Sequence, residues 1–318
     1  MTNRPLIILS PPRSFSSVVS TMLGQHPELY GFPELHLFVG DTVREVLDRE
    51  YKHGNYGGPP GVLRTLAQLH DGVQTSATIL RAIGWLIGHQ DWGSKALLDY
   101  LLEKVAPRIG VEKSPVTCAR PLWIERAYTS YPQAYYLHLT RHPVPTRQSM
   151  AEFFENNRRR KGRTSGRDDM MDRLMSWYIM HNNIASFTNG LPTGQTLRVR
   201  GEDILSEPDT YLPQICEWLG IRTDREAILA MKHPELSPYA LPGPMPAPGG
   251  NDPKFMQSPA LRVGRIREPS FDAFIESTQV QWLSEALREE FEEIGLSLAT
   301  EREVADEVAD FAHHLGYF

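Results

Sequence analysis

The sequence predicts an α/β fold, in which a central parallel sheet of four or five strands is flanked by helices. Three observations lead to this prediction: short continuous apolar runs, amphipathic segments between them, and a serine-rich turn after the first run. The first run, Leu6 to Leu9, has no polar residue, which is typical of a strand buried on both faces of a parallel sheet. Strands that alternate with helices favour such a sheet.

The remaining elements follow in order along the chain. Further strands are expected at 110–115, 134–139 and 196–199. Apolar residues recur at helical spacing over 18–25, 35–52, 62–105, 121–131, 145–154, 170–188 and 208–219. Gly24 and Gly220 follow two of these helices, as helix-ending glycines do. We expect residues 35–105 to form a helical insert that lies against the sheet as a cap.

Three segments lie outside the strand–helix alternation. The polar stretch 156–169 is expected to be a mobile connection, and its basic run at 158–163 is either a solvated loop or a flap that steers an acidic molecule. Residues 234–264 are rich in Pro and Gly and are expected to form a long irregular segment that shapes a site. Residues 269–318 are expected to be helical, which completes a single domain over 1–318.

The composition excludes several classes of protein. The 33 Lys and Arg residues are outnumbered by 39 Asp and Glu residues, so no bulk basic footprint for nucleic acid is present. No stretch of about 20 apolar residues occurs, so we expect no membrane span. The first apolar run is too short for a secretion signal, which favours a cytoplasmic location. Cys118 and Cys216 alone do not make a disulfide scaffold or a metal site.

The turn after the first strand, PPRSFSS at 11–17, has the character of a phosphate cradle. A turn that leads from a parallel strand into a helix gathers backbone N–H groups, and the helix dipole adds positive potential there. Ser14, Ser16 and Ser17 add hydroxyl donors, and Arg13 adds a full charge. The P-loop signature ending in Gly-Lys-Ser or Gly-Lys-Thr is absent. The alternative interpretation is a serine-rich helix cap.

A second anion-binding candidate follows the strand at 134–139. In LTRHPVPTRQS, Arg141 lies at the end of the strand and Ser149 lies eight residues further, in the next helix. Sites in open α/β sheets form at the carboxyl ends of the strands, so both side chains are candidates to bind a second phosphate. Taken singly, each also fits a surface arginine or a capping serine.

The two motifs together resemble those of the PAPS-dependent sulfotransferases. PPRSFSS is similar to their 5′-phosphosulfate loop, and LTRHPVPTRQS is similar to their 3′-phosphate motif. The segment 197–221 resembles the family's strand, Glu-Asp turn and helix, and GGNDPKF at 249–255 resembles the late segment that closes over the nucleotide. The segment PELHL at 33–37 is similar to one in bacterial members. The resemblance spans about residues 5–265.

This resemblance implies a P-loop-NTPase-like fold and the cofactor PAPS (3′-phosphoadenosine 5′-phosphosulfate; product PAP), without a metal. The cofactor-binding residues that it implies are Arg13, Ser14, Phe15, Ser16, Ser17, Arg141, Ser149 and Lys254. The family usually has Gly where this chain has Phe15. Phe15 therefore predicts either an ordinary backbone conformation at this position or a ring that points into the acceptor pocket.

Catalytic candidates follow from the same resemblance. Glu34 is similar in placement to the general base of relatives that sulfate sugars or tyrosines, and His36 competes with it for this role. Lys113, in GVEKSP, resembles a lysine that reaches the transferring group, and Arg13 would neutralise charge beside it. The alternative interpretations are a helix-capping Glu34 and a surface Lys113.

The implied activity is in-line transfer of the sulfuryl group of PAPS to a hydroxyl of a small-molecule or carrier-bound acceptor, in enzyme class EC 2.8.2. A P-loop-type nucleotide kinase and a non-catalytic nucleotide-binding protein are the alternatives. No nucleic-acid partner is expected, and the oligomeric state stays open.

Overall fold

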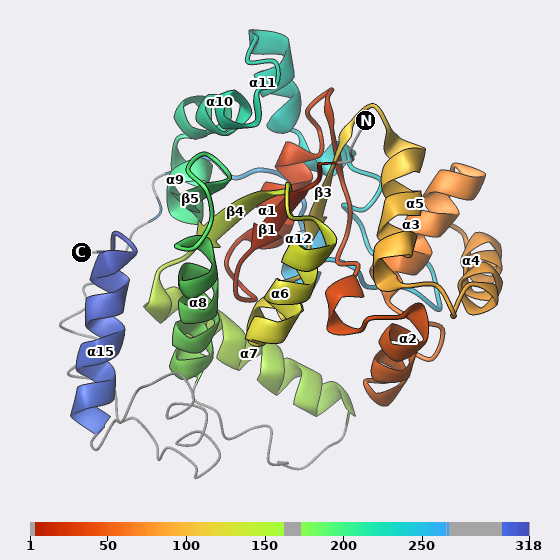
Figure 1. Ribbon diagram of the computed structural model, residues 1–318, viewed down its shortest axis with the longest axis horizontal. Helices are drawn as coiled ribbons and strands as arrows, with labels where there is room; N and C mark the ends of the chain where they lie inside the picture. The colour runs from red at the N-terminus through yellow and green to blue at the C-terminus, as the bar shows by residue number, and fades with distance from the viewer. Residues whose placement is uncertain (1–3, 162–172, 265, 267–300, 318) are drawn as a thin grey trace.

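The computed structural model describes residues 4–161, 173–264, 266 and 301–317, and its centre is a five-stranded parallel sheet (Figure 1). The strands are β1 Leu6–Leu9, β2 Leu29–Gly31, β3 Ile109–Lys113, β4 Tyr135–Thr140 and β5 Thr196–Arg200. Their order across the sheet is β2-β3-β1-β4-β5, with Ile8 of β1 opposite Lys113 of β3 and Leu137 of β4. The predicted fold class is confirmed.

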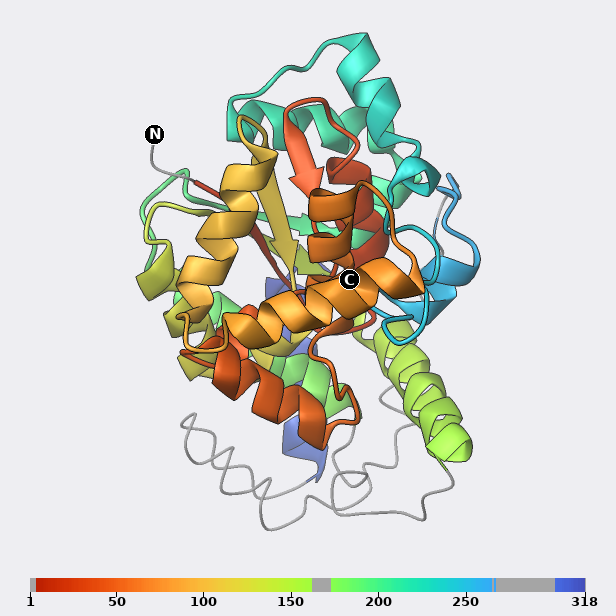
Figure 2. The same cartoon turned by 90° about the vertical axis from the view of Figure 1, so that its right-hand side faces the viewer.

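Helices cover both faces of this sheet. The longer ones are α1 Ser16–Leu23, α2 Val43–Lys52, α3 Pro60–Asp71, α4 Ser76–Gly88, α5 Ser94–Val105, α6 Pro121–Ser130, α7 Pro143–Lys161, α8 Arg173–Thr188, α10 Pro208–Leu219 and α15 Glu301–His314. Shorter ones are α9 Gly201–Ser206, α11 Arg225–Met231, α12 Pro253–Gln257, and the 3₁₀ turns η1 Leu37–Val39, η2 Pro115–Ala119 and η4 Pro234–Leu236. Seen from the side of the cap, α3, α4 and α5 lie in front of the sheet (Figure 2).

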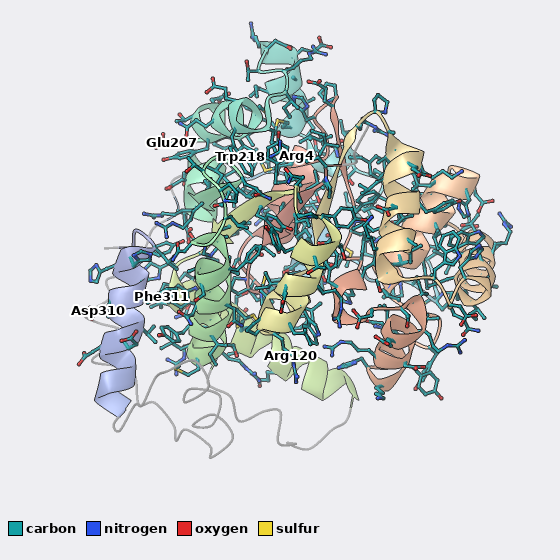
Figure 3. The ribbon with its side chains drawn as sticks, viewed as in Figure 1. Arg4, Arg120, Glu207, Trp218, Asp310 and Phe311 are labelled. Atoms are coloured by element: carbon teal, nitrogen blue, oxygen red, sulfur yellow. The ribbon has the colours of Figure 1, made fainter. Side chains whose placement is uncertain are left out.

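The end of the chain packs beside β4. Phe311 of α15 points toward α8 (Figure 3), where its ring lies 5.3 Å from that of Tyr178 and 6.1 Å from that of Trp177. The buried Tyr317 hydroxyl lies 2.8 Å from Thr140 Oγ1, at the end of β4. The described end of the chain thus supports the strand that leads to Arg141. The other predicted C-terminal helices, within 267–300, lie outside the described residues.

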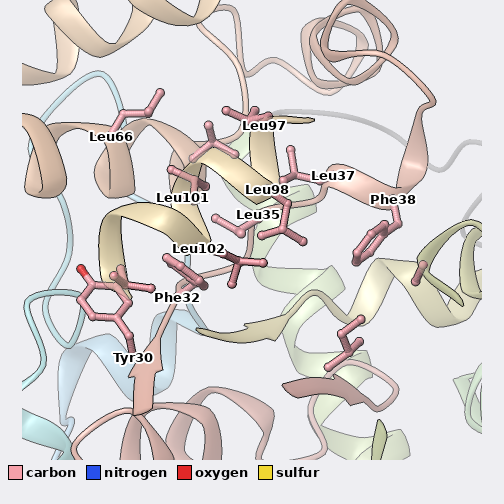
Figure 4. Close-up of a cluster of buried hydrophobic side chains, with 14 of the residues drawn as sticks. Tyr30, Phe32, Leu35, Leu37, Phe38, Leu66, Leu97, Leu98, Leu101 and Leu102 are labelled. Atoms are coloured by element: carbon pink, nitrogen blue, oxygen red, sulfur yellow. The ribbon is translucent and has the colours of Figure 1, made fainter. Parts of the chain in front are cut away.

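The first strand explains why the fold has two cores. Leu6 and Ile8 face a cluster that includes residues of α1, α9 and α10, whereas Ile7 and Leu9 face a cluster that includes α3, α5 and α6. All four side chains are at most 1% exposed, as the uninterrupted apolar run predicts. In the second cluster, leucines of α5 meet Phe32, Leu35 and Phe38 (Figure 4). This packing holds the segment after β2 against the cap.

Several element boundaries differ from the sequence prediction. Edge strand β2 was not expected, because it has only three residues and ends at Gly31. The helix expected over 35–52 begins only at Val43, because the Thr42 side chain caps it by accepting from Glu45 N–H. The helix expected over 145–154 runs from Pro143 to Lys161, so the prediction of a mobile connection is wrong for 156–161. Its remainder lies outside the described residues.

A buried arginine ties the irregular segment 234–264 to the cap. Arg64 of α3 is 1% exposed and donates to Gln74 Oε1 at 2.7 Å, to the Gly249 carbonyl at 2.9 Å and to the Leu241 carbonyl at 2.8 Å. Burial lowers the pKa of Arg64 to about 10, which leaves it charged at neutral pH. One cation therefore satisfies several carbonyls of a segment that has few backbone hydrogen bonds of its own.

We expect Arg64→Met to lower the free energy of unfolding by about 2–4 kcal/mol, because the buried carbonyls would lose their donors. Urea denaturation measures this change. The matched control is Arg81→Met, because Arg81 is exposed and forms an ion pair with Asp71 on the cap surface, so its loss should change stability by less than about 1 kcal/mol. Equal effects of the two substitutions would contradict the role of Arg64.

Among the described residues, no helix combines the length and the apolar character that crossing a membrane requires.

Candidate active site

A cavity of about 440 Å³ opens at the carboxyl edge of the sheet, where β1 and β4 end. The turn after β1, the start of α1, helix α7 and the segment 252–266 line it. Four cationic side chains face this space: Arg13, Arg141, Lys254 and Arg262. In a chain with net charge −6, this concentration of positive charge favours an anionic ligand.

The turn after β1 adopts a strained backbone. Arg13 and Phe15 have φ angles of 68° and 62°, in the left-handed region that non-glycine residues rarely enter. The turn carries the N-terminus of α1, whose first N–H groups have no partner within the helix. The Ser14 hydroxyl is buried and has no hydrogen-bond partner in the described part of the chain. The turn thus offers several free donors at one point.

The structure tests one of the two sequence expectations for Phe15. Its backbone is left-handed, so the prediction of an ordinary conformation is wrong. Its ring lies against the start of α9, where a Cβ on Gly201 would meet Phe15 Cδ2 at 2.6 Å, and the Arg141 guanidinium lies 4.2 Å above the ring. The ring therefore supports an arginine of the cationic cavity by a cation–π contact. The alternative, that the ring points into the acceptor pocket, stays a prediction.

The two predicted anion-binding motifs meet across this cavity. Arg141 donates through NH1 to the Arg13 carbonyl at 2.5 Å, and its buried Nε has no partner in the described structure. Burial lowers the pKa of Arg141, and Glu202 partly offsets this effect. Arg13 Nε donates to Ser149 Oγ at 3.0 Å, two turns into α7. Arg13 and Arg141 are thereby fixed in one place by both motifs.

A chain of charged side chains runs from this cavity toward the cap. Lys113 is fully buried, and its Nζ donates to Ser17 Oγ at 3.0 Å, Glu34 Oε1 at 2.8 Å and Asn251 Oδ1 at 3.0 Å. Glu34 Oε2 lies 3.4 Å from His36 Nε2, and His36 Nδ1 lies 2.9 Å from Glu50 Oε1. Lys113 thus connects the cradle residue Ser17 with a carboxylate that remains 23% exposed.

His36 is held in place by its backbone as well as by its ring. Its φ angle is 55°, which makes it the third non-glycine residue with a positive φ among the described residues. Its N–H donates to Ser114 Oγ at 2.9 Å, and this hydroxyl donates to the buried Glu112 carboxyl. Burial raises the pKa of Glu112 to about 7. Strained residues that the surroundings fix in this way cluster at functional sites.

The neighbouring charged side chains determine the charge states of Glu34 and His36. Burial disfavours charge on Glu34, but Lys113 and His36 outweigh it and lower the pKa of Glu34 to about 2. Burial also disfavours the imidazolium, but Glu34 and Glu50 outweigh it and raise the pKa of His36 to about 9. At neutral pH the structure therefore holds an ionised Glu34 beside a protonated His36.

Because folding stabilises the protonated form of His36, the free energy of unfolding should fall at alkaline pH. Because its folded pKa of about 9 lies above the unfolded value of about 6.5, its contribution is fully present below about pH 6.5 and is lost as pH rises through about 9. We expect the free energy of unfolding to fall by about 2–3 kcal/mol over this range. His36→Asn tolerates a left-handed backbone and should abolish this fall in denaturation curves. An equal slope in this variant would contradict the assignment.

Two of the cationic side chains of the site form ion pairs with carboxylates of the protein itself. Asp252 forms an ion pair with Arg13, and its N–H donates to Ser17 Oγ at 2.9 Å. Lys254 pairs with Glu152 of α7 at 2.5 Å. The segment that carries Asn251 and Asp252 thereby lies directly over the cradle, held from behind by Arg64.

A family model described as the sulfotransferase family matches residues 5–225. The chain belongs to the sulfotransferase family. The match spans the cradle, the Glu34–Lys113 pair and the motif from Arg141 to Ser149. A search of curated proteins finds no significant match.

Solved structures of other sulfotransferases have the same fold as this one. The sulfotransferase domain from the curacin biosynthetic pathway is 21% identical, with a TM-score of 0.68, over 99% of this chain and 98% of that chain. The sulfotransferase domain from the Synechococcus PCC 7002 olefin synthase is 22% identical, with a TM-score of 0.65, over 98% of this chain and 94% of that chain. At these identities the likeness concerns the fold alone.

The structure of this sulfotransferase brings the residues singled out from the sequence into two adjoining groups. Those that line the cavity are Arg13, Phe15, Ser16, Ser17, Arg141, Ser149 and Lys254. Ser14 lies buried within the cradle turn, and Lys113, Glu34 and His36 continue from Ser17 toward the cap. Their roles stay predictions.

Further polar residues contact or line this sulfotransferase site without having been singled out. Glu50 contacts His36, and Asn55 contacts Glu50. Asn251 and Asp252 contact Lys113 and Arg13, and Arg262 lines the cavity. Asn251 and Asp252 lie within GGNDPKF, so the resemblance of that segment was the available signal. The sequence signal for Glu50 was weaker: it is a carboxylate on the apolar face of α2, where Val43 and Val46 also lie.

Proposed function

We propose that this sulfotransferase transfers the sulfuryl group of PAPS to a hydroxyl of an acceptor. One observation carries the proposal: a cationic phosphate-type cradle and an ionised carboxylate meet at a single buried lysine. Lys113 contacts Ser17 of the cradle at 3.0 Å and Glu34 at 2.8 Å. A nucleotide on one side of Lys113 and a hydroxyl on the other would therefore lie next to each other.

The residues of the cavity fit a nucleotide with two anionic ends. Two buried donors, Ser14 Oγ and Arg141 Nε, have no partner in the described structure, and buried donors of this kind are rarely left unpaired. Ser14, Ser16 and Ser17 with the start of α1 would hold the 5′ phosphate. Arg141 and Ser149 would hold the 3′ phosphate, and Lys254 at the rim adds charge.

PAPS, when bound, supplies a sulfuryl group whose transfer to the acceptor oxygen releases PAP. Glu34 is the group that can accept the proton of the attacking hydroxyl, because it is ionised at neutral pH and partly exposed. His36 is already protonated below about pH 9, so in this state it cannot act as the base. It orients Glu34 from the side opposite Lys113.

Lys113 and Arg13 would stabilise the negative charge that develops on the transferring group. Lys113 is fixed by three acceptors, and Arg13 by Ser149 and Asp252, so both charges are oriented before substrate binds. Preorganised charge of this type is commonly the largest catalytic contribution, with one donor worth about 3–4 kcal/mol. This arrangement does not need the lysine of the Gly-Lys-Ser or Gly-Lys-Thr signature that P-loop enzymes have.

Incubation with PAPS and a panel of alcohols and phenols tests the proposal directly. We expect PAP to form together with an equal amount of sulfated acceptor, as measured by chromatography and mass spectrometry. Phosphorylation of an acceptor by ATP, without transfer from PAPS, would overturn it.

The ion pair between Asp252 and Arg13 should weaken the binding of PAP. Because Asp252 neutralises Arg13, we expect Asp252→Asn to tighten PAP binding by about 3- to 10-fold. Asparagine keeps the oxygen that accepts from Lys254 N–H at the start of α12. Calorimetric titration with PAP measures the change. Glu152→Gln is the control with a smaller effect, because Glu152 pairs with the exposed Lys254 and acts on Arg13 without an ion-pair contact. Weaker binding by the Asp252 variant would contradict this account.

A further inference from the structure

Two arginines each lie over the ring of one tryptophan, Trp123. Arg49 on α2 lies 4.5 Å from the Trp123 ring centroid, and Arg120, immediately before α6, lies 5.5 Å from it. Trp123 itself is 8% exposed, so the indole is a fixed support for both guanidinium groups. Figure 3 shows Arg120 at the start of α6, on the lower edge of the molecule, where the strands end.

Neither guanidinium has an ion-pair partner of its own among the described residues. Arg126, one and a half turns along α6, shows the contrast, because it pairs with Asp41 through Nε and NH2 at 2.5 and 3.0 Å. Glu50 is the carboxylate that faces Arg49, and both of its oxygens are already engaged, by His36 at 2.9 Å and Asn55 at 2.5 Å. Two neighbouring positive charges thus have no carboxylate of their own among the described residues.

The two positive charges repel each other, which disfavours the charged form of Arg49. Burial lowers the pKa of Arg49, Glu50 raises it, and the charge of Arg120 lowers it again. The start of α6 adds to this potential, because it has no side-chain cap and no acidic residue in its first turn. Paired cations supported by an aromatic ring, without a carboxylate of their own, are an arrangement suited to an anion.

The position of this pair ties it to the reaction. Arg49 is next to Glu50 in α2, Glu50 contacts His36, and His36 contacts Glu34. This path of contacts reaches Glu34 through Oε2, whereas Lys113 contacts Oε1, so the pair is linked to the base through the carboxylate oxygen that Lys113 does not contact. An anion here is separate from the phosphates that Arg13 and Arg141 would bind.

We propose that Arg49, Arg120 and Trp123 bind an anionic group, a phosphate or a carboxylate, of the acceptor whose hydroxyl reaches Glu34. The inference rests on the proposed function, because it names the class of acceptor for that site: a hydroxyl compound with an anion distant from the hydroxyl. A neutral alcohol of the same shape would lack this contact. The two guanidinium groups act by binding and orientation and take no part in proton transfer.

The test uses the Trp123 indole as a reporter. Proton–nitrogen NMR of the full chain follows the Trp123 indole N–H, identified by its loss in Trp123→Phe. Two probe pairs are titrated at constant ionic strength: glycerol phosphate beside glycerol, and γ-hydroxybutyrate beside butanediol. The variant is Arg49→Met with Arg120→Met, and the control is Arg44→Met with Arg81→Met, which removes two exposed arginines of the cap. PAP binding is measured on the same samples.

We expect the anionic member of at least one pair to shift the Trp123 signal and its neutral twin to leave it unchanged. The phosphate and carboxylate pairs show which anion is preferred. In the Arg49 and Arg120 variant the apparent affinity should fall by about 10- to 100-fold, while the control variant keeps it and PAP binds equally to all.

Other outcomes would overturn the inference. Equal shifts with neutral and anionic probes, no shift with any probe, or unchanged affinity in the double variant would each contradict it. A wild-type protein that fails to bind PAP but shows the anion-dependent shift would overturn the proposed function and leave the anion site standing.

Discussion

Glu34→Gln is expected to reduce the rate of sulfuryl transfer by about 10²–10⁴-fold while leaving PAP affinity nearly unchanged. Glutamine keeps the size of the side chain and an oxygen for Lys113, but it cannot accept a proton. The low pKa of Glu34 also predicts that the rate stays level from about pH 6 to pH 8, because the carboxylate is ionised throughout. Rates with saturating PAPS and an acceptor alcohol measure both.

His36→Asn distinguishes the two candidate bases. If Glu34 is the base, this variant loses only the orientation of the carboxylate and should retain more activity than Glu34→Gln. If His36 were the base, the wild-type rate would climb toward pH 9 as the imidazolium loses its proton. Full activity of Glu34→Gln together with an inactive His36→Asn would reverse the assignment.

Arg141→Met is expected to weaken PAP binding by about 10²-fold, which corresponds to the roughly 3 kcal/mol that a charge-assisted hydrogen bond can contribute. Methionine keeps a flexible apolar side chain over the Phe15 ring but removes the charge and the unpaired Nε. AMP has no 3′ phosphate, so its affinity should change much less. Calorimetric titration of both nucleotides gives this ratio.

The matched control is Arg147→Met. Arg147 belongs to the same motif but is not among the residues that line the cavity. Its loss removes an equal charge from α7, the helix that follows Arg141, so PAP affinity should remain close to that of the wild type. If both variants weaken PAP and AMP by equal factors, Arg141 acts through general charge and does not read the 3′ phosphate.

Local sequence patterns were sufficient for the cradle. An apolar run, a serine-rich turn and a helix place Ser14, Ser16 and Ser17 at the carboxyl end of β1, since few other arrangements bury such a strand. The spacing of Arg141 and Ser149 places both beside Arg13, one at the end of β4 and one two turns into α7. Each pattern spans fewer than about 15 residues, which is the range over which periodicity is informative.

Contacts between distant segments could not be read in this way. Asp252 reaches Arg13 from 239 residues away along the chain, and Asn251 reaches Lys113 from 138 residues away. No periodicity or motif encodes such pairs; they depend on Arg64, which holds the segment that carries them. The ionisation of Glu34 and His36 likewise depends on neighbours that only the folded chain brings together.

Backbone conformation was the other missing part. Side-chain type argued against a left-handed Phe15, yet the packing of its ring between Gly201 and Arg141 outweighs a local cost of about 1–2 kcal/mol. The helix start at Val43 was missed because Leu35, Leu37 and Phe38 continue the apolar spacing of α2. These residues belong to the segment after β2, which includes the 3₁₀ turn η1 and packs against the cap.

Calorimetric titration of the wild-type protein with PAP, ATP and AMP, each without magnesium, measures whether the site selects a nucleotide with a 3′ phosphate. We expect PAP to bind at least about 100-fold more tightly than ATP or AMP, because the cavity has cations for both a 5′ and a 3′ phosphate. Preferred binding of ATP, and only after magnesium is added, would contradict the sulfotransferase account of this site and favour a nucleotide kinase.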